Sequence, residues 1–150
     1  MYTIEEFDKL KTRVLKYIMY KKRTENEVKR KFAEVDSELL DDVIEHLKEI
    51  GYINDKSYVE RAISEFMNLN NLSLKELKYK LQSKGVDTSA MDEYIYNHED
   101  ELEEYEINSA KNIILKKQNT MEEQAIIQHL LKKGYKMDSI RQAINLINIE

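Results

Sequence analysis

An all-helical fold is predicted by three features of this sequence. Glycine occurs only three times in 150 residues and proline not at all, whereas a β-rich fold needs such turn residues at every hairpin. Ser or Thr followed three residues later by Glu, the pattern of a helix capping box, precedes segments whose apolar residues recur at helical spacing. The apolar positions themselves recur after 49 residues, which is typical of an array of stacked helical units.

The helices are predicted as three triplets, each opened by a longer helix. These first helices are expected at about Thr3–Lys21, Asp55–Leu69 and Glu101–Lys117. In a capping box the hydroxyl and the Glu side chain satisfy each other's backbone N–H groups, so that each box marks a helix start. The sequence holds four such boxes: Thr3…Glu6, Thr24…Glu27, Ser73…Glu76 and Thr120…Glu123.

The second and third helices of each triplet carry the repeat. Phe32, Leu81 and Leu130 lie 49 residues apart and are expected to be equivalent core residues that face the third helix of their own unit. The register is imperfect in two places. In the first unit the loop between the second and third helices is about two residues shorter, and Thr120 comes two residues before the position that the period predicts.

Glycines mark the ends of helices in this pattern. Gly51, within "LKEIGYINDKSYVERA", is expected to end the first unit, with Tyr52 and Ile53 packing the corner and Asn54 or Asp55 capping the next helix. The expected repeats are residues 1–54, 55–100 and 101–150. The alternative is a single irregular helical bundle whose segments resemble one another by chance.

Composition restricts the class of protein. With 41% hydrophobic and 35% charged residues, the chain is too apolar to be disordered. It has no Cys, which excludes disulfides, thiolate nucleophiles and Cys-ligated zinc. The start "MYTIEEFDKLK" lacks the pattern of a signal peptide, and no segment is apolar enough to span a membrane. We expect a cytoplasmic protein.

The net charge of −5 conceals a strong segregation along the chain. Residues 1–33 hold ten Lys or Arg and five Asp or Glu, whereas residues 34–54 hold one basic and seven acidic residues. Residues 87–106 hold nine acids and no Lys or Arg. The first two helices of the first two units are therefore basic and the third acidic, so that a stacked array could present a basic surface to a polyanion. The alternative is a set of solvated faces whose charges pair with their neighbours.

The charge pattern suggests nine residues that contact a partner: Lys16, Lys21, Lys22, Arg23, Lys29, Arg30, Arg61, Lys78 and Lys80. Tyr17, Tyr20 and Tyr79 stand among basic residues and could stack on exposed bases, or pack half-buried between helices.

No catalytic or metal site is expected. The three histidines share no spacing, and His46 with Glu49 lacks a third convergent ligand for a metal. The acidic stripe from Asp41 to Glu49 lies on a predicted helix, whereas calcium loops need irregular backbone. The glycines stand alone, so that no phosphate-binding loop is present. We therefore expect a protein that is not an enzyme and has no cofactor.

Four stretches give the chain a resemblance to a known family. "YIMYKKRTENEVKRKF", "LKEIGYINDKSYVERAISEF", "SLKELKYKLQSKGVD" and "HLLKKGYKMDSIRQAI" resemble, in this order and spacing, the RecX family of bacterial regulators of the RecA recombinase. The likeness covers nearly the whole chain. It implies a crescent of three tandem three-helix repeats.

The resemblance also implies a function in recombination, DNA repair and the SOS response. Such a protein, expected as a monomer, would bind along the groove of the RecA–DNA filament, block filament growth and lower the ATPase, strand-exchange and coprotease activities of RecA. Two other functions fit the residues. One is a helical module that binds nucleic acid without a protein partner, and the other is a generic helical adaptor.

Overall fold

The computed structural model describes residues 1–149, and this part of the chain forms nine α-helices and no strand. The prediction of an all-helical protein is thereby confirmed. The helices are α1 (Ile4–Tyr20), α2 (Glu25–Lys31), α3 (Ser37–Glu49), α4 (Asp55–Leu69), α5 (Leu74–Ser83), α6 (Thr88–Asn97), α7 (Glu99–Lys117), α8 (Glu123–Lys133) and α9 (Met137–Ile149).

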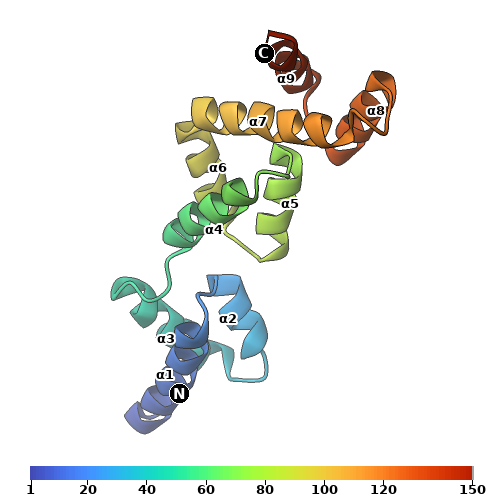
Figure 1. Cartoon of the computed structure of the whole chain (residues 1–150). Helices are drawn as coiled ribbons and strands as arrows, with labels where there is room; N and C mark the ends of the chain where they lie inside the picture. Colours follow the sequence, from blue (N-terminus) through green and yellow to red (C-terminus); the bar gives the residue numbers. More distant parts are fainter. Residues whose placement is uncertain (150) are drawn as a thin grey trace.

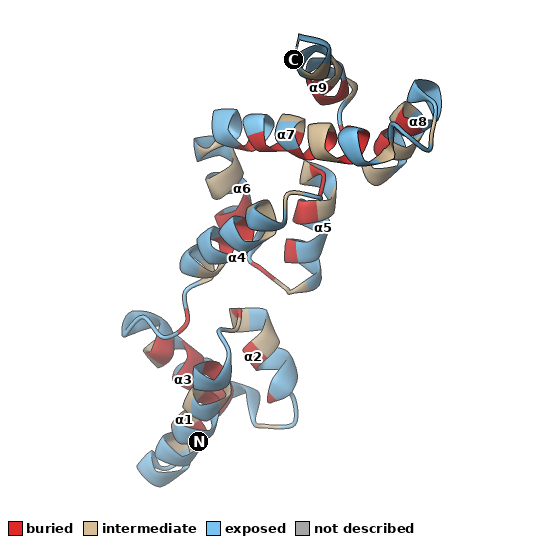
Figure 2. Ribbon diagram, in the orientation of Figure 1, coloured by how far each residue is buried: buried red, intermediate tan, exposed pale blue. Residues whose placement is uncertain are grey.

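The helices form an elongated, bent molecule (Figure 1). We call α1–α3 unit 1, α4–α6 unit 2 and α7–α9 unit 3. Each unit surrounds its own cluster of buried apolar side chains, so that the buried faces of its helices point inward (Figure 2). Phe32, Leu81 and Leu130 are 4%, 0% and 0% exposed and each belongs to the cluster of its own unit. Their expected equivalence as core residues agrees with this burial.

The 49-residue period is visible in the helix starts. The second helices begin at Glu25, Leu74 and Glu123, each 49 residues after the one before. The capping boxes at Thr3, Thr24 and Ser73 are all formed. The third helices begin at Ser37, Thr88 and Met137, which places the two missing residues in the loop of unit 1, as predicted.

The capping box predicted at Thr120 is wrong. Helix α8 starts at the position set by the period, with Glu122 before it and no side chain capping it. The Thr120 hydroxyl instead donates to the carbonyl oxygen of Lys117 at the end of α7, 3.3 Å away. Packing of α8 in the array therefore overrides the local signal.

The second helices follow one another end to end along one edge of the molecule (Figure 1). The hydroxyl of Thr24, which caps α2, donates to the carbonyl oxygen of Lys84 at the end of α5 (2.9 Å). The hydroxyl of Ser73, which caps α5, donates in the same way to Lys133 at the end of α8 (2.7 Å). The positive end of one helix dipole therefore meets the negative end of the next. We call the interface between units 1 and 2, which contains the contact between α2 and α5, joint 1–2. The interface between units 2 and 3, which contains the contact between α5 and α8, is joint 2–3.

Glycine is required at both joints. Gly85 and Gly134 have φ of +76° and +99°, in the left-handed region that disfavours other residues. A Cβ at Gly85 would lie 2.9 Å from the Cβ of Asn26 in unit 1, and one at Gly134 would lie 2.8 Å from the Cβ of Lys75 in unit 2. Gly51 also has a positive φ, +86°, but its missing Cβ faces open space.

This difference gives a prediction. Gly51→Ala should lower the free energy of unfolding by about 1 kcal/mol, since it adds only backbone strain. Gly134→Ala has the same strain and also pushes unit 2 away from unit 3, so we expect a clearly larger loss. Urea titrations of the two variants measure the difference, and equal losses would show that the close approach at joint 2–3 carries no free energy.

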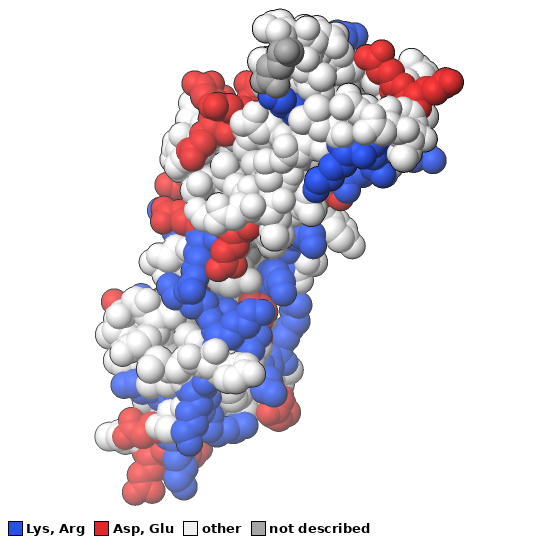
Figure 3. Space-filling model, in the orientation of Figure 1, with Lys and Arg blue, Asp and Glu red and all other residues white. Residues whose placement is uncertain are grey.

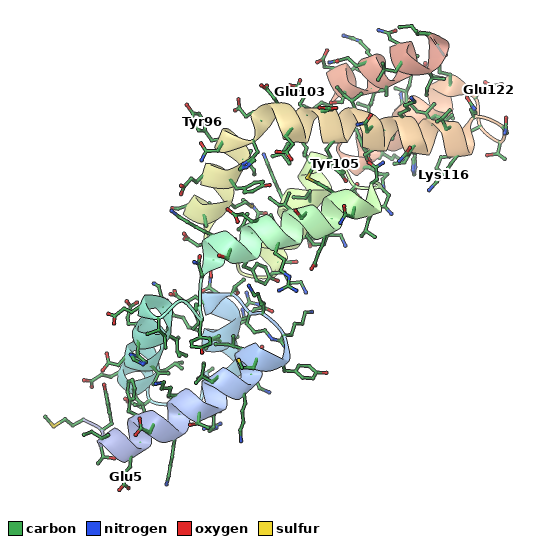
Figure 4. All side chains as sticks on the ribbon, turned by 60° about the vertical axis from the view of Figure 1, so that its left-hand side comes forward. Glu5, Tyr96, Glu103, Tyr105, Lys116 and Glu122 are labelled. Carbon is green, nitrogen blue, oxygen red and sulfur yellow. The ribbon has the colours of Figure 1, made fainter. Side chains whose placement is uncertain are left out.

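Helix α7 belongs to two clusters. Leu102 and Tyr105 on its first half pack into the cluster of unit 2, and Ala110, Ile113 and Ile114 on its second half pack into that of unit 3. Figure 4 shows Tyr105 on the side of α7 that faces unit 2.

A buried hydrogen-bond network adds to this packing. The Tyr105 hydroxyl donates to the carbonyl oxygen of Leu72 (2.8 Å), and Ser109 joins Tyr135 (2.6 Å) to the same carbonyl (3.1 Å). Units 2 and 3 thus share an apolar and hydrogen-bonded connection.

The buried tyrosines predict a loss of stability in alkali. Burial raises the pKa of Tyr105 and, more strongly, that of Tyr135 above the ordinary value of 10. The folded state therefore keeps these protons when the unfolded chain begins to lose them, so that their contribution is complete below pH 10 and declines above it. We expect the melting temperature to fall steeply above about pH 10 in wild type and less steeply in Tyr135→Phe. Equal slopes would contradict the prediction.

The corner between units 1 and 2 agrees in part with expectation. Ile53 is buried in the cluster of unit 1, and the Asn54 side chain caps α4 by accepting from the Ser57 N–H. Tyr52 does not pack as predicted, because 49% of it is exposed. The first helix of unit 3 begins at Glu99, two residues before its predicted start.

Candidate functional site

Cationic side chains gather in one band on the face shown in Figure 3. The band runs from α1 past α2 and α5 to the region of α7 and α8, and so extends over all three units. Acidic side chains gather on the opposite edge, beside α6 and the start of α7. The charge segregation seen along the sequence is therefore in part a segregation in space, and further acidic side chains lie beside α8 and at the N-terminal end of α1. We call this feature the cationic band; the residue assignments below come from burial and contacts.

Four of the predicted contact residues are free to meet a partner. Lys16, Lys21, Lys22 and Lys78 are exposed, and none of them has an ion pair with another of the residues 1–149. An unpaired surface lysine is fully available to an anion, since no internal partner must first be displaced.

The other five predicted residues have contacts of their own. Arg61 and Lys29 are exposed but pair with Glu65 (3.4 Å) and Glu25 (3.3 Å). The exposed Lys80 ammonium lies 5.8 Å from the centre of the Phe66 ring. These are weak surface interactions that a partner could replace.

Arg23 has a structural role, whereas Arg30 is exposed beside Gly85. The Arg23 guanidinium stacks on the Tyr17 ring at 4.3 Å and approaches Glu27 at 3.8 Å, and only 19% of its side chain is exposed. Its Nε is buried and has no hydrogen-bond partner in the described part of the chain. Arg30 lies against Gly85 in joint 1–2. Changing Arg23 would alter the fold as well as the charge.

The sequence interpretation missed the cations of unit 3. Lys116 and Lys132 are exposed and Lys117 is half-buried, on the last turns of α7 and α8. In Figure 4 Lys116 and Glu103 project from opposite sides of α7. His129 lies among these lysines, and burial together with Lys117 and Lys133 lowers its pKa. The excess of seven basic over four acidic residues in 107–150 was the available signal.

A cleft of about 520 Å³ lies between the end of α1 and the start of α4. Lysine, arginine and tyrosine side chains line it, among them Tyr20, Lys21, Lys22, Arg23, Tyr52 and Arg61. Tyr20 is 87% and Tyr52 49% exposed, so that both rings are accessible. Positive charge beside accessible rings suits an anion that also offers a flat or apolar group.

The three tyrosines singled out in the sequence differ in their surroundings. Tyr17 is half-buried, between Arg23 and Phe32. Tyr20 and Tyr79, at 87% and 72% exposed, are not packed between helices. Half-buried packing therefore holds only for Tyr17, and the other two rings remain available for stacking.

Neither of the candidate metal positions is assembled into a site. His46 packs edge-on against the ring of Phe7, with the ring centres 5.8 Å apart. Among residues 1–149 no three His, Asp or Glu side chains converge as ligands. Within the same residues no helix combines the length and the apolar character needed to cross a membrane.

A chelator experiment tests the absence of a structural metal. We expect EDTA to leave the melting temperature unchanged, because a metal that binds only the folded state would stabilise it by mass action. The measurement is a thermal melt with and without chelator, together with assays for nucleotide and DNA hydrolysis, for which we expect no activity. A shift of several degrees would contradict the interpretation that neither His46 nor the acidic stripe on α3 binds a metal.

Comparison with known proteins gives a consistent result, although no family model matches the chain. "Regulatory protein RecX" of Finegoldia magna is 31% identical over 136 residues, covering 85% of this chain and 66% of the relative. "Regulatory protein RecX" of Staphylococcus haemolyticus is 30% identical over 141 residues, covering 91% of this chain and 53% of the relative. The chain thus spans between about half and two thirds of the length of these relatives.

Solved structures show the same fold. The crystal structure of RecX from Lactobacillus salivarius superposes with a TM-score of 0.82 at 24% identity, covering 99% of this chain and 100% of that one. A second crystal structure, of regulatory protein RecX, gives a TM-score of 0.79 at 23% identity, covering 93% of this chain and 73% of that one. At this level of identity the likeness concerns the fold.

Proposed function

Because the chain belongs to the RecX family of regulatory proteins, we propose that it binds the RecA–DNA filament and restrains its growth and its ATPase, strand-exchange and coprotease activities. In this proposal the protein acts in the cytoplasm as a monomer, has no enzymatic activity of its own and takes part in recombination, DNA repair and the SOS response. Its three repeats are residues 1–54, 55–100 and 101–150, with α7 crossing the second boundary.

The cationic band is the observation that carries this proposal. It extends over three units of a repeated scaffold, and a long, regular surface suits a partner that is itself long and regular. The unpaired lysines Lys16, Lys21, Lys22 and Lys78 supply positive charge from units 1 and 2, and Lys116 and Lys132 from unit 3. Such a distribution attracts an anionic groove and orients the protein along it.

The acidic edge fits the same proposal. Asp100, Glu103 and Glu104 line the hollow between α7 and α9 on the opposite edge of the molecule. A second polyanion would be repelled from that edge, so that the protein binds in one orientation.

An ATPase titration tests the proposed function. We expect the protein to lower the ATP hydrolysis of RecA on single-stranded DNA in proportion to the amount bound, and to lower it further when filaments are still growing. Unchanged ATP hydrolysis at a concentration that saturates the filament would show that binding does not restrain RecA.

The cleft between α1 and α4 favours a second candidate function. Exposed Tyr20 and Tyr52 beside Lys21 and Lys22 could stack and neutralise a single strand of nucleic acid without a protein partner. Salt dependence separates the candidates, because phosphate contacts release counterions and give a steep fall of affinity with salt. A generic helical adaptor would bind neither RecA filaments nor DNA.

A further inference from the structure

Two carboxylates bridge the joints between units in the same way. Asp55, the first residue of α4, accepts from the backbone N–H of Glu25 (3.1 Å) through Oδ1 and from that of Asp87 (2.8 Å) through Oδ2. It therefore connects the first turn of α2 in unit 1 to the start of α6 in unit 2.

Glu106 on α7 forms the corresponding bridge at joint 2–3. Its Oε2 accepts from the backbone N–H of Leu74 (2.8 Å) at the start of α5. Its Oε1 accepts from the backbone N–H of Lys136 (3.2 Å) and from the hydroxyl of Ser139 (2.9 Å), at the start of α9. Glu106 is 1% exposed, so that a buried charge is satisfied by three donors.

The geometry of each bridge restrains orientation as well as distance. Each carboxylate holds the N-termini of two helices from different units, and helix N-termini favour negative charge. The cap hydroxyl of the same second helix, Thr24 or Ser73, binds the following unit a short distance away. Two such contacts at one joint oppose rotation about either of them.

The two joints differ in what else supports them. Joint 2–3 has the shared helix α7, whose Leu102 and Tyr105 lie in the cluster of unit 2. At joint 1–2 the buried residues of α4, Val59 and Ile63, all belong to the cluster of unit 2. Polar contacts therefore contribute a larger part of the interaction between units at joint 1–2 than at joint 2–3.

We propose that Asp55 and Glu106 are positioning residues that fix the orientation of successive units and thereby the spacing of the cationic band. At joint 1–2 the loss of the carboxylate lets unit 1 move relative to unit 2 while both stay folded. At joint 2–3 the apolar connection through α7 keeps the units together. The effect of this spacing on binding to RecA filaments rests on the proposed function, whereas the orientation of the units does not.

Distance measurements between spin labels test this inference directly. The chain has no Cys, so that labels can be attached at introduced cysteines alone. Lys9→Cys with Tyr96→Cys reports on units 1 and 2, and Tyr96→Cys with Lys132→Cys reports on units 2 and 3; all three positions are exposed. Double electron–electron resonance spectroscopy then gives a distance distribution for each pair of labels.

We expect Asp55→Ala to broaden the distribution between units 1 and 2 and to leave that between units 2 and 3 unchanged, with the helical circular dichroism retained. Asn54 still caps α4 in this variant. Glu60→Ala, an exposed acid on the same helix, is the matched control and should change neither distribution. Should Asp55→Ala unfold, Asp55→Asn repeats the test, since it keeps one acceptor oxygen for two N–H donors and should give an intermediate width.

An unchanged width between units 1 and 2 in both Asp55 variants would overturn the proposal, and so would an equal broadening between units 2 and 3. The affinity of the Asp55→Ala variant for RecA filaments should fall by about threefold or more, because its mobile unit 1 must be ordered when the protein docks. If a variant has a broader distance distribution but binds RecA filaments as wild type does, the spacing of the cationic band does not matter for binding. Absence of binding by wild type would overturn the proposed function and leave the distance result standing.

Discussion

Leu130→Ala is expected to lower the free energy of unfolding by about 2–5 kcal/mol, and Leu131→Ala, one residue further on, by far less. The expected difference follows from burial. Leu130 is 0% exposed in the cluster of unit 3 and its truncation leaves a cavity, while Leu131 is 41% exposed. Both leucines lie on α8, so that helix propensity and chain position are matched.

Leu81→Ala and Phe32→Ala should lower the free energy of unfolding to a similar extent as Leu130→Ala. Counted from the start of the second helix of its unit, each of the three is the eighth residue; Phe32 is at the same time the C-cap of α2. Urea titration followed by circular dichroism measures all four variants. A Leu131→Ala variant as unstable as Leu130→Ala would contradict the assigned register of α8, and a silent Leu81→Ala would contradict the equivalence of the units.

Reversal of charge on the cationic band is expected to have the largest effect on binding. The variant changes Lys16, Lys21, Lys22 and Lys78 to Glu together and leaves Arg23 and Arg30, which have internal contacts, in place. A single exposed ion pair contributes only about 0–1 kcal/mol, so that one substitution should do little. Four reversals add repulsion that can cost several kcal/mol at an interface, and we expect more than tenfold weaker binding to RecA filaments.

A control variant adds two negative charges on the other edge, against a change of eight charge units in the reversal. Asn108→Glu with Asn145→Glu extends the acidic hollow between α7 and α9 and should bind as wild type. Both variants should keep their helical circular dichroism. If the control weakens binding as much as the reversal of the four lysines, the cationic band is not the docking face.

Local signals were sufficient to predict the helices. Three of four capping boxes are formed, the helix predicted at Asp55–Leu69 has those bounds, and the second helices start 49 residues apart. The failure at Thr120 has a physical cause. A cap contributes about 1 kcal/mol, which packing of Ile126 and Leu130 and the contact between Ser73 and Lys133 can outweigh.

The joints between units could not be predicted from the sequence. Asp55 and Glu106 have equivalent roles but lie 51 residues apart and are different residues, so that the 49-residue period does not pair them. Their partners are backbone N–H groups, which every residue except proline carries. The sharing of α7 between two clusters was also invisible, because its apolar residues face two directions along one continuous helix.

For the candidate site, the sequence predicted a basic surface and nine contact residues, which remain predictions. Alternation of basic and acidic segments indicated a basic surface, and Lys16, Lys21, Lys22 and Lys78 are exposed and unpaired among residues 1–149. The sequence could not show that Arg23 stacks on Tyr17, since that contact depends on the turn between α1 and α2. Nor did it show that Lys116 and Lys132 extend the positive charge into unit 3.

Co-sedimentation with RecA filaments tests the central claim most directly. The protein is centrifuged with RecA assembled on single-stranded DNA, with the same DNA alone and with RecA alone, at low and at physiological salt. We predict that it sediments with the filament at both salt concentrations and with naked DNA only weakly at low salt, because phosphate contacts are lost as salt rises. Equal recovery with naked DNA and with filaments, falling steeply with salt, would contradict the claim that RecA filaments are its partner.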